Sequence, residues 1–144
     1  MTETDKIIEI LGGTKYVGKE SNKQQSLIPA IQRGFCFDTL VFLKGLYELP
    51  DDLAQKIIAV STRTWARRKA QNLLSPVESD RLYRLARIIA RTEEVFGSRE
   101  KARLWLKEPN RALHLQTPLS LLDTDEGTRR VEDVLIRIEH GVFS

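Results

Sequence analysis

The sequence contains little of what secreted, membrane-spanning and metal-dependent proteins need. Cys36 is the single cysteine, so no internal disulfide can form, which fits a reducing cytoplasm. No apolar run approaches the roughly 20 residues that cross a bilayer, and the first residues lack the basic start and apolar stretch of a secretory signal. The two histidines, His114 and His140, belong to no cluster with the spacing of metal ligands. We therefore expect a cytoplasmic protein without a membrane segment, a metal ion or a cofactor.

Residue groups typical of catalysis are scarce as well. Cys36 has no base nearby and no evident helix N-terminus to activate it, and between two phenylalanines we expect it to be a small buried hydrophobic residue. Adjacent acidic residues such as Asp51 and Asp52 are typical of exposed helix ends rather than of a catalytic pair. Gly12-Gly13 lacks the Lys-Ser/Thr ending of a phosphate-binding loop. The sequence thus predicts no catalytic residue and a protein that is not an enzyme.

Helix start and stop signals are abundant. The 144 residues suffice for one ordinary domain or two very small ones. Most helical segments follow an N-cap residue such as Ser61, Ser98 or Thr124, and Ser75 forms a capping box with Glu78. The predicted helices span about residues 5–11, 27–33, 39–47, 51–58, 62–71, 76–96, 99–107 and 125–140, with short helical turns near 109 and 117–123. We predict an all-α protein.

Two segments need separate consideration. Residues 14–25 are polar and contain Gly18, and they predict a linker whose order the sequence leaves open. The apolar run at residues 35–43 fits a helix or a buried strand by its period. Asp38 as an N-cap favours the helix, and a strand would have no obvious partner. At the start of the chain, Thr4 is the expected cap of the first helix.

Positive charge is concentrated in the middle of the chain. Residues 61–103 carry 11 basic and 5 acidic side chains, whereas the segments on either side are slightly acidic. Such a block is the expected footprint of a phosphate-binding surface. Charge alone, however, favours a solvated helical face over a ligand.

The start of this basic block resembles a helix-turn-helix. Residues 51–58 supply a short first helix, residues 59–61 the turn and residues 62–71 the capped second helix. We expect Val60 to fill the wedge between the helices and Trp65 to point into the core. The candidate DNA-binding residues are Thr62, Arg63, Thr64 and Arg67 for base edges, and Arg68 and Lys69 for phosphates. The turn lacks glycine and Gln55 replaces a small packing residue, so a basic amphipathic helix without nucleic acid remains the alternative.

A row of arginines follows on the helix at residues 76–96. It has three interpretations: an extension of the DNA footprint, a protein interface, or a solvated face, of which the solvated face is the default. The row consists of Arg81, Arg84, Arg87 and Arg91.

Several segments together resemble the Xre/MbcA/ParS antitoxins. They are Arg63-Thr-Trp-Ala-Arg-Arg-Lys69, Leu74-Ser-Pro-Val-Glu-Ser-Asp-Arg-Leu82, Val95-Phe-Gly97, Trp105-Leu106, Pro109-Asn-Arg-Ala-Leu113, Thr117-Pro-Leu-Ser-Leu-Leu-Asp-Thr124, Gly127 and Arg137-Ile-Glu-His-Gly-Val-Phe143. The match runs in order over about residues 27–144. It implies an Xre-like helix-turn-helix domain followed by a C-terminal toxin-binding domain. It also implies that the chain is an antitoxin, not an enzyme.

In this family the partners are RES-domain toxins, which deplete cellular NAD. The resemblance implies that the chain covers the active-site entrance of such a toxin and, with it, binds the promoter of its own operon. The expected organisation is an N-terminal helix and linker at residues 1–25, the helix-turn-helix domain at 26–96 and the toxin-binding domain at 97–144. We also expect a homodimer within a toxin–antitoxin hetero-oligomer. The alternative is a stand-alone transcription regulator whose last module mediates dimerisation or other protein binding.

The candidate toxin contacts lie near the end of the chain. Arginines can enter a pocket shaped for phosphates, and Phe143 can serve as an aromatic anchor. For each single residue an ordinary surface position remains an equal alternative. The candidates are Arg129, Arg130, Arg137, His140, Val142, Phe143 and Ser144.

Overall fold

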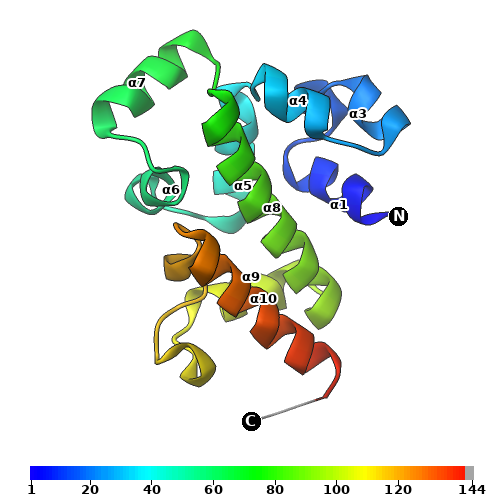
Figure 1. Ribbon diagram of the computed structural model, residues 1–144, viewed down its shortest axis with the longest axis vertical. Helices are drawn as coiled ribbons and strands as arrows, with labels where there is room; N and C mark the ends of the chain where they lie inside the picture. The colour runs from blue at the N-terminus through cyan, green and yellow to red at the C-terminus, as the bar shows by residue number, and fades with distance from the viewer. Residues whose placement is uncertain (142–144) are drawn as a thin grey trace. The chain divides into compact units, whose positions relative to one another are not determined.

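The computed structural model describes residues 1–141, apart from the side chains of residues 22–24. Within this range every regular element is helical, and the only pairing of extended backbone is an isolated bridge between Asn110 and Gln116. The all-α prediction is therefore confirmed. The chain forms two compact units, one from Met1 to Arg87 and one that begins at Ile88. The division falls inside the long helix α8, Pro76–Phe96, rather than at its end (Figure 1).

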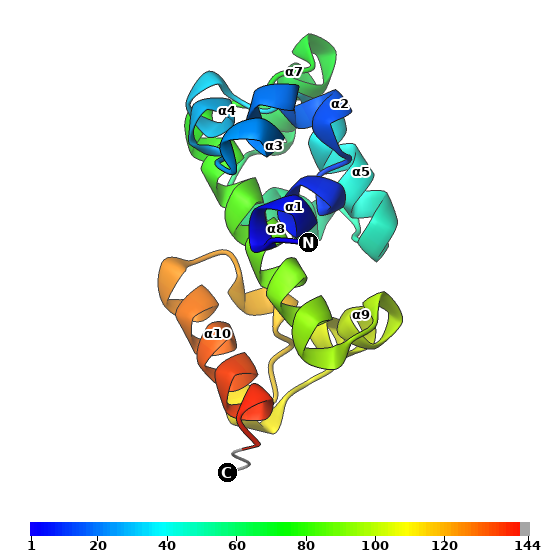
Figure 2. The ribbon, with the colours of Figure 1, turned by 90° about the vertical axis from the view of Figure 1, so that its right-hand side faces the viewer.

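The first unit begins with three short helices, α1 (Glu3–Ile10), α2 (Thr14–Val17) and α3 (Lys19–Gln24). The predicted linker is wrong, because α2 and α3 occupy it. Val17 is fully buried, and the buried hydroxyl of Ser21 donates to its carbonyl oxygen at 3.1 Å. Gly18, with φ of 96°, provides the turn between the two helices. α1 and α2 pack against α5 (Phe37–Tyr47), whereas α3 packs against α1, α2 and α4 (Ile28–Arg33) (Figure 2).

The cap of α1 also differs from the prediction. Thr2 is the N-cap, and its hydroxyl accepts from the backbone of Asp5 at 3.0 Å. Asp5 in turn accepts from the backbone of Thr2 at 3.1 Å, which completes a capping box. Thr4, the predicted cap, lies inside the helix.

Four helices complete the first unit before α8. They are α4 (Ile28–Arg33), α5 (Phe37–Tyr47), α6 (Asp51–Ile58) and α7 (Thr62–Gln71). The ambiguous run at residues 35–43 is mostly helical, as Asp38 suggested, but the N-cap is Cys36. The expectation that Cys36 is buried and away from a helix N-terminus is wrong: it is half-buried, with Sγ 3.8 Å from the Tyr16 carbonyl oxygen.

The second unit contains the end of α8, then α9 (Arg99–Lys107), two short 3₁₀ turns η1 (Arg111–Leu113) and η2 (Leu119–Leu121), and α10 (Asp125–Glu139). Its buried hydrophobic residues are Ile88, Ile89, Ala90, Ala102, Leu106, Leu113, Leu119, Leu122, Val131, Val134 and Leu135. Ser98 and Thr124 cap α9 and α10 as predicted, with their hydroxyls accepting backbone hydrogen bonds at 3.2 and 2.9 Å. The turn expected at Pro109 is capped by Asn110 instead.

No helix among residues 1–141 combines the length and the hydropathy that crossing a bilayer requires.

Candidate nucleic-acid interface and partner-binding groove

The turn between α6 and α7 contains a left-handed residue, a position that glycine usually occupies, but here the residue is not glycine. Ala59 adopts the left-handed conformation, with φ 63° and ψ 53°. Its N–H donates to the Lys56 carbonyl oxygen at 3.2 Å, and the N–H of Val60 donates to that of Gln55 at 3.1 Å. These bonds close the end of α6 in the way a C-terminal glycine does. An alanine in this conformation costs about 1 kcal/mol, so the turn is formed against a local strain.

Helix α7 lies on the surface of the first unit. None of its residues, all of which the structure describes, is buried. Trp65, predicted to point into the core, is half-buried and packs edge-on against Phe37 of α5, with the ring centroids 5.1 Å apart. Lys44 approaches the indole from above, with Nζ 5.5 Å from the ring centroid. Beyond the end of α7, the side chains of Asn72 and Asp38 are 3.0 Å apart in a hydrogen bond.

The outward face of α7 carries most of the predicted DNA-binding residues. Thr62, Arg63, Arg67 and Lys69 are exposed. Thr64 is half-buried instead, and both its amide and its hydroxyl lie 3.1 Å from the hydroxyl of Ser61, the N-cap. The structure therefore presents two arginines one turn apart on the exposed face.

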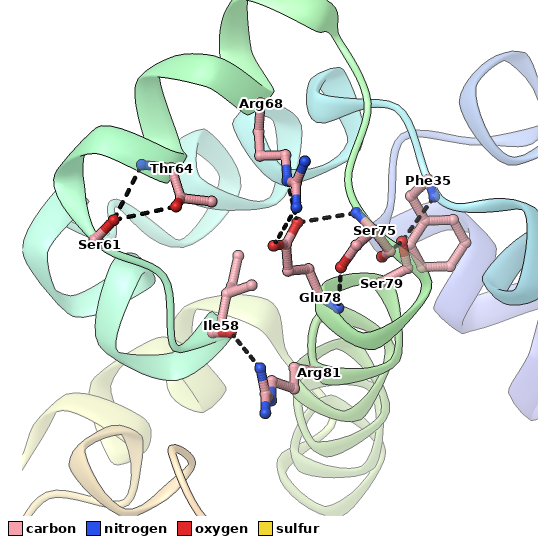
Figure 3. Close-up of polar contacts among 9 residues, drawn as sticks. All are labelled: Phe35, Ile58, Ser61, Thr64, Arg68, Ser75, Glu78, Ser79 and Arg81. Atoms are coloured by element: carbon pink, nitrogen blue, oxygen red, sulfur yellow. Dashed lines mark hydrogen bonds and ion pairs between the residues drawn. The ribbon is translucent and has the colours of Figure 1, made fainter.

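Arg68, the sixth predicted DNA contact, has a partner inside the protein. Its Nε and Nη2 donate to the two carboxylate oxygens of Glu78 at 2.8 and 3.1 Å (Figure 3). Glu78 is only 6% exposed and also accepts from the backbone of Ser75 at 2.9 Å, within the predicted capping box. Burial raises the pKa of Glu78, but the hydrogen bonds from Arg68 and Ser75 outweigh it and hold that pKa below its usual value. The same contact raises the pKa of Arg68.

The first turns of α8 hold two further parts of the helix-turn-helix. Arg81 donates from Nη1 to the carbonyl oxygen of Ile58, the last residue of α6, at 3.1 Å. Ser79 accepts the N–H of Phe35, which precedes α5, at 2.8 Å. Figure 3 shows these contacts together with the Arg68–Glu78 pair. The start of α8 is thus a polar support for the turn and for α7.

The arginine row of α8 is not the solvated face that we took as the default. All four arginines are half-buried. Arg81 binds the end of α6, as described, and Arg91 pairs with Glu139 of α10 at 2.7 Å. Arg81 and Arg91 therefore each make a contact within their own unit.

A groove of about 520 Å³ opens on the second unit. Leu113 and Val134, both buried, contribute apolar surface to it, while Arg130, Asp133 and Arg137 line it from α10. The charged side chains recur every three or four residues, so they share one face of the helix.

The segment at residues 112–116 also lines the groove, through Ala112, Leu113, His114 and Gln116. The backbone N–H of Asn110 donates to the Gln116 carbonyl oxygen at 3.0 Å, which closes this segment into a small loop. His114 and Leu115 both have positive φ, of 56° and 65°, an unusual conformation for these residues. Leu115 is 67% exposed. Strained backbone with an exposed leucine is typical of binding loops, yet nothing in the periodicity of the sequence indicated it.

The predicted toxin contacts fall into three groups. Arg130 and Arg137 line the groove. Arg129 and His140 are exposed on α10 and at its end. The remaining three, Val142, Phe143 and Ser144, lie outside the described residues. In residues 1–141 no three His, Cys, Asp or Glu side chains gather in a group that could hold a metal ion.

Two protein-family models match the chain. The Antitoxin Xre-like helix-turn-helix domain matches residues 26–87, and the Antitoxin Xre/MbcA/ParS C-terminal toxin-binding domain matches residues 91–141. The chain is similar to Antitoxin Xre of Yersinia enterocolitica, with 29% identity over 132 residues that cover 90% of this chain and 89% of the relative. It is 45% identical to Antitoxin Xre of Pseudomonas putida over 64 residues, which cover 44% of this chain and 40% of the relative.

A third relative is the Prs ADP-ribosylating antitoxin of a Sphingobium species, 32% identical over 95 residues, or 59% of this chain and 60% of the relative. All three relatives are named as antitoxins. The matches confirm the resemblance and the arrangement of a helix-turn-helix domain before a toxin-binding domain. This protein is an antitoxin with a helix-turn-helix domain, and it belongs to the Xre/MbcA/ParS family.

Proposed function

We propose that this antitoxin neutralises a RES-domain toxin that depletes NAD, by covering the entrance of the toxin's active site. The observation that carries the proposal is the match of residues 91–141 to a toxin-binding domain, on a unit that presents an open groove. The name of the Sphingobium relative refers to ADP-ribosylation, a reaction that consumes NAD, which supports a partner of NAD-consuming chemistry. A substrate pocket must be accessible to work, so a protein across its mouth inhibits without any chemistry of its own.

The groove of the second unit is the surface that we assign to the toxin. Its apolar lining residues, such as Leu113 and Val134, and its arginines provide the combination of buried contact and directed hydrogen bonding that dominates protein interfaces. Arg130 and Arg137 would pair with acidic groups of the toxin. The exposed Leu115, between the groove-lining residues His114 and Gln116, would bury its side chain against the toxin. Arg129 and His140 extend this surface, and residues 142–144 are proposed to reach the toxin from its edge.

The exposed face of α7 is the surface that we assign to promoter DNA. Arg63 and Arg67 would bind guanine edges in the major groove, Thr62 a thymine methyl group and Lys69 a phosphate. Of the remaining predicted contacts, Thr64 and Arg68 face partners within the protein. A homodimer within the toxin–antitoxin complex would place two α7 helices on half-sites about one DNA turn, or roughly 34 Å, apart. The chain would act in the cytoplasm, where both the promoter and NAD are found.

Co-expression with the toxin encoded by the adjacent gene tests the neutralising activity. The toxin alone should arrest growth and deplete NAD, and this chain should restore both. Growth arrest that the chain fails to relieve would refute the proposal.

Paired variants separate the two surfaces. Arg63→Ala with Arg67→Ala should abolish operator binding and spare neutralisation. Arg130→Glu with Arg137→Glu should weaken toxin binding and leave operator binding by the antitoxin itself in place. A loss of both functions in either variant, with an unchanged circular dichroism spectrum, would contradict the assignment of separate surfaces.

A further inference from the structure

We propose that Glu78 is a positioning residue for DNA reading, and that it acts by fixing α7 through Arg68. The proposal rests on the DNA-binding half of the proposed function. It assigns Arg68 to the orientation of the helix rather than to a phosphate.

Helix α7 has few other restraints on its orientation. It buries none of its described side chains, so close packing does not define its rotation. Trp65 makes its contact with Phe37 on one side, and Asn72 with Asp38 holds only the end. Arg68 is the half-buried side chain that ties the middle of the helix to α8.

Two parallel hydrogen bonds restrict a guanidinium in direction as well as in distance. Glu78 provides this geometry, with 2.8 and 3.1 Å to Nε and Nη2 of Arg68. Side chains on a helix end about 6 Å from its axis, so a rotation of about 20° displaces their tips by about 2 Å. Arg63 and Arg67 lie on the same short helix, and a displacement of that size would break a base contact, which tolerates only a few tenths of an ångström.

The burial of Glu78 also favours its pairing with Arg68. Its carboxylate is almost fully buried, and removing the guanidinium to a phosphate would leave a buried charge without its counterion. The same carboxylate closes the capping box with Ser75, so its own position is fixed by the start of α8. The start of α8 therefore fixes Glu78, and Glu78 fixes the orientation of α7 through Arg68 (Figure 3).

Glu78→Gln tests the inference with little change in the fold. Glutamine serves in a capping box as glutamate does, and it keeps the side-chain volume while removing the charge that orients Arg68. The complex of the full-length Glu78→Gln variant with its toxin should bind operator DNA about tenfold more weakly than the wild-type complex. Its affinity for random duplex and its neutralisation of the toxin should remain within about twofold, because neither depends on the rotation of α7.

The opposite assignment predicts the opposite result. If Arg68 is a phosphate contact that Glu78 restrains, Glu78→Gln frees it. Affinity for operator and random DNA would then rise together, and the slope of log affinity against log salt would steepen by about 0.9. That result would overturn the inference.

Asp80→Asn is the matched control, because Asp80 is an exposed acid on the same turn of α8. It removes the same charge without touching the Arg68–Glu78 pair, so it should change operator and random affinities equally. Hydrogen exchange adds a second measurement: Glu78→Gln, but not Asp80→Asn, should accelerate exchange of the α7 amides. Operator binding that is unaffected by Glu78→Gln would sink this inference alone. A wild-type complex that binds no operator would sink the DNA-binding half of the proposed function with it.

Discussion

Helices α7 and α10 lie on surfaces with different proposed partners, and they are held in place by different physics. α10 buries Val131, Val134 and Leu135, so its position follows from side-chain packing. α7 buries no residue in its described length and depends on a ring contact and on polar contacts with neighbouring elements. The packing of a helix is the sum of many weak contacts, so losing one changes its position little. A single hydrogen-bonded ion pair, in contrast, is either formed or lost. We therefore expect changes near α10 to affect stability most, and changes near α7 to affect orientation.

The largest effect is expected at Gly127, where α10 passes close to η2. A Cβ at this position would lie 2.0 Å from the backbone oxygen of Leu121. Gly127→Ala should destabilise the second unit by about 3 kcal/mol and abolish toxin neutralisation. Chemical denaturation measures the first effect and co-expression the second.

Gly45 provides the matched control for this substitution. It lies inside α5, is exposed, and a Cβ there would meet nothing within 4 Å. Gly45→Ala should stabilise the first unit by up to about 1 kcal/mol. Equal effects of the two substitutions would contradict the packing geometry at Gly127.

Truncating one apolar side chain in each helix sharpens the comparison. Leu135→Ala in α10 removes a side chain that is 0% exposed and should cost about 3 kcal/mol. Trp65→Ala in α7 removes a larger but half-buried side chain, together with one edge-on ring contact, and should cost about 1–2 kcal/mol. Urea unfolding of each variant provides both values. A greater loss for Trp65→Ala would show that α7 is held by packing after all.

Acid should loosen α7 through Glu78. The pKa of Glu78 is lower in the folded protein than in the unfolded chain. The pair with Arg68 therefore contributes its full stability above the unfolded pKa, and the contribution is lost as pH falls through the lower folded pKa. Hydrogen exchange of the α7 amides should accelerate in this range. Glu78→Gln should remove the pH dependence, and an unchanged profile would show that another group causes it.

The smallest effect is expected in the turn before α7. Glycine at position 59 would relieve the left-handed strain of Ala59, although it also gives the unfolded chain more freedom. Ala59→Gly should thus stabilise the first unit by about 0.5 kcal/mol. A thermal melt that shifts downward would show that the turn is not strained.

Signals that act within three or four residues predicted the helices well. Ser61, Ser75, Ser98 and Thr124 each begin a helix where the sequence placed it, because an N-cap hydroxyl bonds to an amide only two or three residues ahead. Proline predicted the starts of α6 and α8, because it is favoured in the first turn of a helix or just before it.

Features that depend on distant residues were missed. The helicity of residues 14–24 depends on the burial of Val17, which only the tertiary fold provides. The pairing of Arg68 with Glu78 was not predicted, because Glu78 belongs to the next helix. The groove depends on a loop that closes between Asn110 and Gln116 with two residues at positive φ, and no periodic pattern encodes such a loop. Hydrogen bonds within three or four residues can be predicted from a sequence, whereas contacts between different helices cannot.

The exposed side of α7 has an evolutionary consequence. Substitutions at surface positions of a helix usually change stability by less than about 0.5 kcal/mol, so the outward residues of α7 can be exchanged almost without penalty to folding. If α7 reads promoter DNA as proposed, a duplicated gene can change its DNA target through a few codon changes, while residues 91–141, which match a toxin-binding domain, stay the same. On that proposal, two copies in one genome would bind different promoters before their toxin-binding domains diverge.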